Sequence, residues 1–310
     1  MQIRIGQMME FVGTGITNQE NIGMRERLAA YVELTKPRIA FMLVLTSAAG
    51  FYLGSAGLLK ITVFINAMIG IALLAFGVAT LNQFVERGID GLMLRTANRP
   101  LPKRKISPLE ALVFGVVQCG IAEAYLYFLI NGLTALLGLF VIVGYVLIYT
   151  PLKTRTSAST AIGAFPGAMP PLMGWTAASG EITLGAWALF AMLFLWQFPH
   201  FLAIAWMYRE QYAKAGILML PVVEPRGSIT ARQIILFAAF LLPVSLAPFF
   251  IGFAGIVYLI GAVILGSWFL FESIRMARLR TFEAARRLLV ASVIYLPLIF
   301  GLLVFDRWRV

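Results

Sequence analysis

The sequence predicts an all-α membrane protein, a bundle of about nine transmembrane helices around a central cavity. Of its 310 residues, 60% are hydrophobic and only 13% charged, and the mean hydropathy of +0.87 is far above that of a soluble protein. Apolar stretches of roughly 20 residues, enough to cross a hydrocarbon core of about 30 Å as a helix, recur along the chain. These stretches do not alternate in polarity as barrel strands do, and backbone groups in lipid must bond internally, so we expect helices.

The predicted spans follow one another from residue 38 onward as a single transmembrane domain over residues 31–310. They cover residues 38–58, 62–86, 108–130, 133–150, 160–179, 183–206, 233–253, 255–274 and 288–305. Residues 1–30 are expected to form a flexible cytoplasmic segment. This segment has no basic start followed by an apolar core, which speaks against a secretory signal or a mitochondrial transit peptide and favours a bacterial inner membrane.

The basic residues predict the orientation of the bundle. If the N-terminus is cytoplasmic, all of the 25 Lys and Arg residues except Lys60, Arg307 and Arg309 fall in segments on the cytoplasmic side. Positively charged loops remain inside the cell, so we expect the N-terminus and the active site to be cytoplasmic. The net charge of +11 is explained by this asymmetry, and no nucleic-acid partner is expected.

The second span ends in a polar motif. Asn82, Glu86 and Asp90 are spaced four residues apart and therefore share one helix face. Oxygen ligands on such a face suit Mg²⁺ bridging a diphosphate, whereas the alternative is a helix end with solvated carboxylates. In the following loop, Arg95 and Arg99 could grip a diphosphate or could act only as topology signals.

The next polar residues lie at the ends of the fourth and sixth spans. Tyr149 and Lys153 pair an aromatic ring with a cation that could bind diphosphate. In the sixth span, Trp196, Gln197 and His200 lie within about one turn. His200, the only histidine, could ligate a metal ion or simply bond to a neighbouring helix.

A mixed patch follows the sixth span, formed by Tyr208, Arg209, Glu210, Tyr212 and Lys214. The two tyrosine rings could bind a cation through their faces, or they could belong to an interfacial aromatic belt. Between these two polar regions, the fifth span is rich in glycine and proline, which allow close helix packing and a lateral opening to lipid.

These motifs resemble those of the intramembrane aromatic prenyltransferase superfamily, and are most similar to the protoheme IX farnesyltransferases, or haem O synthases. The resemblance rests on an ordered set of segments from residue 34 to about residue 221: Leu34-Thr-Lys-Pro-Arg38, the spaced motif from Asn82 to Pro102 with Arg95-Thr-x-x-Arg99-Pro-Leu, Tyr149-Thr-Pro-Leu-Lys153, Gly163-Ala-Phe-Pro-Gly167, Trp196-Gln-Phe-Pro-His200 and Tyr208-Arg-Glu-Gln-Tyr212.

The resemblance implies a nine-helix bundle with two facing polar motifs, and a reaction in which farnesyl diphosphate, haem B and water give haem O and diphosphate. It implies Mg²⁺ at Asn82, Glu86 and Asp90, with Glu210 as a further candidate ligand. It also implies diphosphate binding by Arg95, Arg99, Lys153, Arg209 and Lys214. The catalytic residues would be Asn82, Glu86, Asp90, Tyr149, Lys153 and Tyr208, and the haem contacts would come from Trp196, Gln197 and His200.

The chain departs from related patterns at the second motif. Quinone-type relatives carry an Asp-x-x-x-Asp pair where this chain has Tyr208 and Tyr212, which argues against a quinone-precursor enzyme. The farnesyltransferase pattern has an acid at the position of Gln211, which puts an acidic ligand there in doubt. The resemblance further implies delivery of haem O to terminal-oxidase assembly, through a partner such as a haem A synthase.

Two other hypotheses about the function remain open. The one more similar to the first is a prenyltransferase of the quinone pathway. The other is a transporter, because an intramembrane carboxylate such as Glu123 often marks an ion path. Most polar residues nevertheless crowd the predicted cytoplasmic helix ends, whereas a transporter would place them near the midplane.

Overall fold

The computed structural model describes residues 23–55 and 59–307, and their regular structure is helical. Eight helices in this part of the chain are long and apolar enough to cross a membrane. They are α3 (Pro37–Gly54), α4 (Ile61–Asp90), α5 (Pro108–Leu129), the continuous segment Gly132–Leu152, α10 (Leu184–Met207), α13 (Ser228–Ile251), α14 (Ile256–Leu279) and α15 (Phe282–Phe305). The segment Gly132–Leu152 comprises α6 (Gly132–Ile142), the π-helix η1 (Val143–Tyr149) and α7 (Thr150–Leu152).

The fifth predicted span is present as two short helices, α8 (Ser159–Gly167) and α9 (Met169–Ser179). The segment contains Pro166, Pro170 and Pro171, which lack the N–H that continues an α-helix, so the two helices meet at Ala168. With this pair counted as one crossing, the prediction of about nine transmembrane helices is confirmed.

Some helices extend beyond the expected spans. The predicted basic loop at residues 275–287 is reduced to Arg280 and Thr281, because α14 and α15 extend through the arginines on either side. Long basic side chains reach water while their backbone stays helical, so charge does not mark the helix end. Within the expected flexible segment 1–30, residues 24–30 belong to α2 (Met24–Leu34). Residues 1–22 lie outside the described part, and the flexibility of the segment stays a prediction.

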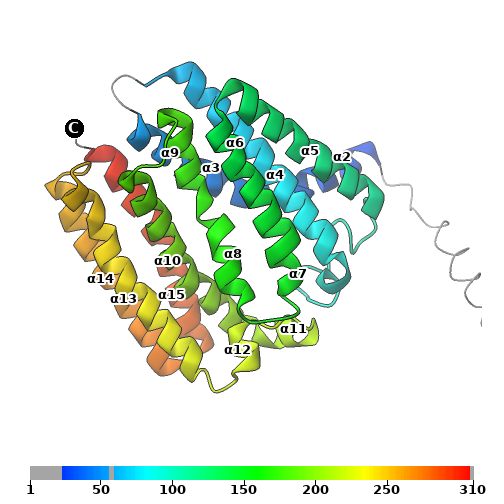
Figure 1. Cartoon of the computed structure of the whole chain (residues 1–310). Coiled ribbons are helices and arrows are strands. Elements are labelled where there is room, and N and C mark those ends of the chain that lie inside the picture. The colour runs from blue at the N-terminus through cyan, green and yellow to red at the C-terminus, as the bar shows by residue number, and fades with distance from the viewer. Residues whose placement is uncertain (1–22, 56–58, 308–310) are drawn as a thin grey trace, which may run out of the picture.

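The long helices lie side by side, with α13 and α14 on one side of the bundle, α4, α5 and α6 on the other, and α8 and α9 between them (Figure 1). The backbones of α3 and α9 approach each other closely. A Cβ added to Gly50 would lie 2.0 Å from the carbonyl oxygen of Pro171, and one added to Gly174 would lie 1.9 Å from that of Ser47. Glycine is therefore required at both positions for the two backbones to touch.

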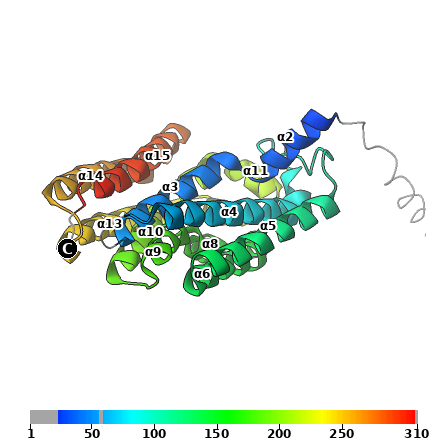
Figure 2. The ribbon, with the colours of Figure 1, turned by 90° about the horizontal axis from the view of Figure 1, so that it is seen from above.

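The polar connections gather at one end of the bundle. The short helices α7, α11 (Arg209–Lys214) and α12 (Leu220–Val223) meet there (Figure 1), and α2 lies at the same end as α11 (Figure 2). Hydrogen bonds link these connections: the N–H of Leu218 donates to the carbonyl of Lys153 at 2.8 Å, and the indole of Trp206 donates to the carbonyl of Arg280 at 3.0 Å. We call this region the polar end.

The opposite end contains the other connections. There Arg307 donates to the carbonyl of Ser55, and its guanidinium lies 4.8 Å from the ring centre of Tyr52. Asn131 caps α6 and also donates to the carbonyl of Thr176 at 2.9 Å. Successive connections thus alternate between the two ends, as the distribution of basic residues predicts.

Candidate functional site

The site is built on the last turns of α4. A 30-residue helix is about 45 Å long, more than a hydrocarbon core of about 30 Å requires, so its C-terminal turns reach the polar end. Asn82, Glu86 and Asp90 lie on one face of these turns and are 1%, 7% and 1% exposed. The predicted shared face is confirmed, and it is turned into the bundle, away from lipid.

The loop after α4 folds back over Asp90. The hydroxyl of Thr96 donates to the carbonyl of Asp90 at 2.7 Å, which turns the chain back towards the helix. This turn lets Arg99 reach the carboxylate of Asp90, where one guanidinium nitrogen lies 2.7 Å from each oxygen. The same nitrogen lies 3.8 Å from Glu86, so Arg99 bridges the two acids.

Two lysines complete this cluster from other elements. Lys153, just after α7, pairs with Glu86 at 2.5 Å. Lys36, between α2 and α3, donates to the side-chain oxygen of Asn82 at 2.6 Å, and the amide group of Asn82 donates to the hydroxyl of Thr150 at 3.1 Å. We call Lys36, Asn82, Glu86, Asp90, Arg99 and Lys153 the central cluster.

The central cluster contains three basic groups and two carboxylates, so it carries excess positive charge. Burial, together with nearby Arg99, lowers the pKa of Lys36 to about 7. Burial would also lower the pKa of Lys153, but the adjacent carboxylate of Glu86 raises that pKa well above its usual range. Such an arrangement is suited to an anionic ligand, which would supply the missing negative charge.

Two tyrosine rings lie beside Lys153. The ammonium of Lys153 lies 4.5 Å from the ring centre of Tyr149, and this ring is 4.9 Å from that of Tyr145. Both tyrosines belong to the π-helix η1, an element frequently found at functional sites. Gly163 of α8 makes room for Tyr149, because a Cβ there would lie 2.4 Å from the ring.

A second contact region joins the loop after α4 to α11. The guanidinium of Arg95 donates to the hydroxyl of Tyr212 at 3.2 Å and lies 5.4 Å from the ring centre of Tyr208. The backbone N–H of Arg95 donates to the side chain of Gln211 at 3.4 Å. The amide of Gln211 therefore joins α11 to this loop, and Tyr208 and Tyr212 share the cation of Arg95.

The candidate haem-contacting residues point to different neighbours. The ring of Trp196 stacks on that of His200, with centres 4.6 Å apart, whereas the amide of Gln197 donates to the carbonyl of Ala164 at 3.1 Å. The ring nitrogen Nδ1 of His200 lies 2.7 Å from the hydroxyl of Ser292, which itself donates to the carbonyl of Leu289 at 2.6 Å. Nδ1 therefore carries the proton, and Nε2 keeps a lone pair that could accept a hydrogen bond or bind a metal.

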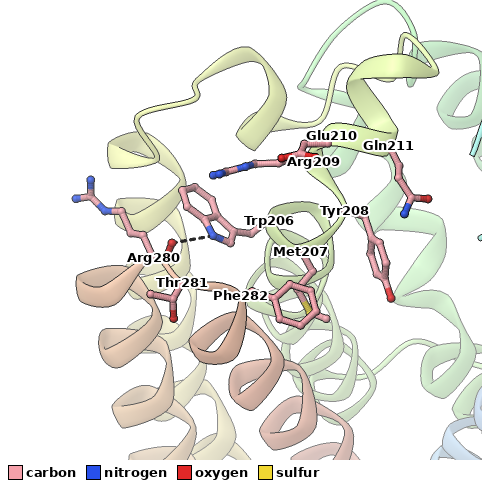
Figure 3. Close-up of a pocket in the computed structure, with 9 residues that line it drawn as sticks. All are labelled: Trp206, Met207, Tyr208, Arg209, Glu210, Gln211, Arg280, Thr281 and Phe282. Atoms are coloured by element: carbon pink, nitrogen blue, oxygen red, sulfur yellow. Dashed lines mark hydrogen bonds between the residues drawn. The ribbon is translucent and has the colours of Figure 1, made fainter. Parts of the chain in front are cut away.

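Other candidates lie away from the central cluster. Figure 3 shows a pocket of about 410 Å³ between the end of α10, the start of α11 and the turn between α14 and α15. Arg209 extends over Trp206 in this pocket, 4.8 Å from the ring centre, while Tyr208 and Gln211 point the other way. Glu210 also lines the pocket, and Lys214 is exposed on α11.

Glu123 lies in a second, mainly apolar pocket of about 400 Å³ along α5 and α6. Its carboxyl oxygen Oε1 is buried and has no hydrogen-bond partner among the described residues, and a Cβ on Gly138 would lie 2.5 Å from it. Nothing in the structure explains this buried carboxyl group. The predicted central cavity corresponds to neither pocket and stays a prediction.

The central cluster offers suitable donors for Mg²⁺. Asn82, Glu86 and Asp90 present oxygen atoms, which hard cations prefer, on one buried face. In the described residues no three His, Cys, Asp or Glu side chains gather, so the protein would supply two carboxylates and an amide and leave further positions to a ligand or water. Arg99 and Lys153, which pair with the two carboxylates, lie close enough to face an anionic ligand bound beside them.

The sequence-based reasoning missed two members of the site. Lys36 was visible within the segment Leu34-Thr-Lys-Pro-Arg38, but this segment lies 46 residues before Asn82, and no spacing rule connects the two. Thr150 holds the amide group of Asn82 from 68 residues further along the chain. Both contacts depend on the packing of separate helices.

Comparison with known proteins identifies relatives over most of the chain. The family model described as UbiA prenyltransferase family matches residues 43–299. The protoheme IX farnesyltransferase of Solibacter usitatus is 47% identical, over 89% of this chain and 98% of the relative. That of Koribacter versatilis is 46% identical, over 92% of this chain and 95% of the relative.

Solved structures agree in fold. A digeranylgeranylglyceryl phosphate synthase has a TM-score of 0.77 at 18% identity, covering 91% of this chain and 98% of that one. A UbiA homolog from Archaeoglobus fulgidus, bound to GPP and Mg²⁺, has a TM-score of 0.66 at 18% identity, covering 88% of this chain and 99% of that one. At this identity the likeness concerns the fold alone.

Proposed function

The chain belongs to the UbiA prenyltransferase family, and from this premise we propose that it transfers the farnesyl group of farnesyl diphosphate to a vinyl group of haem B. Water is added in the same reaction, and the products are haem O and diphosphate. The observation that carries the proposal is the central cluster: oxygen ligands and excess cations in one buried site at the polar end of a membrane bundle. The high identity to protoheme IX farnesyltransferases supports the choice of substrates.

The proposed site binds the diphosphate of the substrate. Arg99 and Lys153 exchange their carboxylate partners for phosphate oxygens, and Arg95 approaches from the loop above. Mg²⁺, when held by Asn82, Glu86 and Asp90, supplies further positive charge against the departing diphosphate. Arg209 and Lys214, also expected to grip diphosphate, would have to move to do so, as would Glu210 to serve as a metal ligand.

The aromatic side chains stabilise the charge that develops on the farnesyl carbon as its bond to oxygen breaks. Tyr149 and Tyr208 already lie beside the cations of Lys153 and Arg95, so their rings present electron-rich faces at the site. The vinyl group of haem then attacks C1 of the farnesyl chain, and water adds to the resulting carbocation. The bundle shields these reactive species from water until this step.

The proposed haem site involves α10. Nε2 of His200 is available to haem iron or to a propionate, with Ser292 fixing the orientation of the ring. Trp196 supports the imidazole by stacking, and Gln197 holds α8 against α10. We further propose a bacterial inner membrane, a cytoplasmic polar end, and transfer of haem O to proteins of terminal-oxidase assembly such as a haem A synthase.

The direct test is product formation. Purified protein given haem B, farnesyl diphosphate and Mg²⁺ should form haem O, detected by its mass and absorption spectrum. Asp90→Asn should lose most of this turnover while it still inserts in the membrane and elutes as a folded protein. Wild-type protein that is inert on haem but prenylates a hydroxybenzoate would favour a quinone-pathway enzyme instead.

A further inference from the structure

Lys36 differs from the other cations of the central cluster in its partner. Arg99 pairs with Asp90 and Lys153 pairs with Glu86, so each of these cations faces a carboxylate. The described polar contact of Lys36 is the neutral side-chain oxygen of Asn82, at 2.6 Å. When it is protonated, Lys36 therefore carries the positive charge that the two carboxylates of the cluster leave uncompensated.

The local backbone fixes Lys36 in this place. The residue has φ 49° and ψ 59°, in the left-handed region that a side chain other than glycine rarely adopts. Pro37 begins α3 directly afterwards, and the hydroxyl of the preceding Thr35 donates to the carbonyl of Val32 at 2.7 Å. An unfavourable conformation kept between two helices indicates that the position of this side chain matters.

The other end of the contact is also fixed. Asn82 is 1% exposed, and its amide group is held by Thr150, whose hydroxyl donates to the carbonyl of Tyr145. Asn82 cannot rotate freely, whereas Lys36 is only partly buried and has a long, flexible side chain. Lys36 can therefore turn from Asn82 to an anion bound in the central cluster. This movement leaves no carboxylate without a cation, because the partner that Lys36 gives up is a neutral amide.

We propose that Lys36 is a diphosphate-binding residue, contacting a phosphate oxygen of the prenyl diphosphate directly. This inference rests on the proposed function, because it assigns a further ligand to the same site. In the substrate-free protein the lysine is held by Asn82, and in the complex it forms a charge-assisted hydrogen bond to the diphosphate. Asn82 is then free to use its oxygen elsewhere in the site.

The test measures binding of inorganic pyrophosphate with Mg²⁺ to the purified full chain by calorimetry. Lys36→Met should weaken binding about tenfold or more, the loss typical of one charge-assisted hydrogen bond. Lys36→Arg should recover part of the affinity. The matched control is Lys60→Met, an exposed lysine at the opposite end, which should bind as the wild type does.

A second experiment, in an Asn82→Ala background, tests whether Lys36 contacts the anion directly or acts only by positioning Asn82. In Asn82→Ala protein, Lys36→Met should weaken pyrophosphate binding further if the lysine touches the anion. No further loss there, or unchanged affinity in the single Lys36→Met variant, would overturn the proposal. If Lys36→Met does not fold, Lys36→Gln is measured in its place, and the same two outcomes decide.

The same experiments keep the two proposals apart. Suppose that the wild-type protein forms haem O and binds pyrophosphate, and that the Lys36 variants bind pyrophosphate equally well. This result refutes the role of Lys36 and leaves the proposed function standing. Wild-type protein that neither binds pyrophosphate nor forms haem O refutes the proposed function.

Discussion

Asp90 shows how a single buried charge is stabilised at the polar end. The residue is 1% exposed, and both carboxylate oxygens accept a hydrogen bond from the same nitrogen of Arg99. Removing the partner of a buried charge is costly, because the remaining group has lost its water without compensation. The pair therefore supports the fold of the loop after α4 as well as the proposed binding of diphosphate.

The first prediction concerns this pair. Arg99→Gln should lower the free energy of unfolding by about 3 kcal/mol, because it leaves the carboxylate of Asp90 buried without a cation. The measurement is thermal unfolding of the purified protein in detergent, together with the haem O assay, which should show little product.

The control is Arg87→Gln, which removes an exposed arginine from the same helix end. Arg87 lies over the ring of Phe84 rather than over a carboxylate, so its loss should change stability by less than about 0.5 kcal/mol. Equal destabilisation by the two variants would contradict the role assigned to Arg99.

At the scale of elements, the contact between α3 and α9 depends on missing side chains. Gly50 and Gly174 let the two backbones touch, and the hydroxyl of Ser47 donates across the contact to the carbonyl of Pro170 at 2.8 Å. In lipid, helices associate through such close packing and hydrogen bonding, since apolar burial gives little preference for a neighbouring helix over lipid.

The second prediction follows from this contact. Gly174→Ala should reduce the thermal stability and the yield of folded protein, because its methyl group would meet the backbone of Ser47, which cannot move aside cheaply. Gly120→Ala is the matched control, since nothing lies within 4 Å of the added atom. Because alanine favours helix over glycine, this control should be unchanged or slightly more stable.

Glu224 controls the start of α13. Its carboxylate accepts hydrogen bonds from the backbone N–H groups of Ser228 at 3.0 Å and Ile229 at 3.1 Å. Burial alone would raise the pKa of this carboxyl, but the N–H and hydroxyl donors at the helix start outweigh that effect and lower the pKa below 4.5. The charged form is therefore favoured in the folded state.

The third prediction is a pH dependence. A lowered pKa in the folded state means that Glu224 contributes stability above pH 4.5, and that this contribution is lost as the pH falls through the folded-state value. Wild-type protein should unfold at a higher temperature than Glu224→Gln at pH 7, and the difference should shrink at pH 4 and below. A difference that stays constant over this range would refute the assignment.

At the scale of the whole molecule, the alternating connections divide the chain between two chemically different ends. One end contains the central cluster and most described basic residues, and the other contains Lys60 and Arg307. Because basic segments usually stay on the cytoplasmic side, this asymmetry predicts that the end with the central cluster faces the cytoplasm.

The fourth prediction tests the orientation. In a Cys119→Ala background, Lys103→Cys should react with an impermeant maleimide only after bacterial cells are made permeable, whereas Lys60→Cys should react in intact cells. Both lysines are exposed, so reactivity reports the side of the membrane. The reverse pattern would place the central cluster outside the cell.

Four features followed from the pattern of residues along the chain: the helical class, about nine crossings, the alternation of their ends, and the shared face of Asn82, Glu86 and Asp90. These features depend on local periodicity and on the low polarity of the bilayer, which leaves the backbone few alternatives. The pattern did not determine the division at Ala168, because the prolines of this segment could also have been accommodated by a kinked single helix.

Which cations meet these acids depends on how distant helices pack. Lys36, Arg99 and Lys153 come from three separate connections, and Arg209, equally basic and close to Tyr208 in sequence, lies over Trp206 instead. Spacing along one helix fixes which of its side chains share a face. The neighbours of that face depend on which other helices can pack closely against it. That packing depends in turn on small residues such as Gly163 and Gly174, where a larger side chain would keep the helices apart.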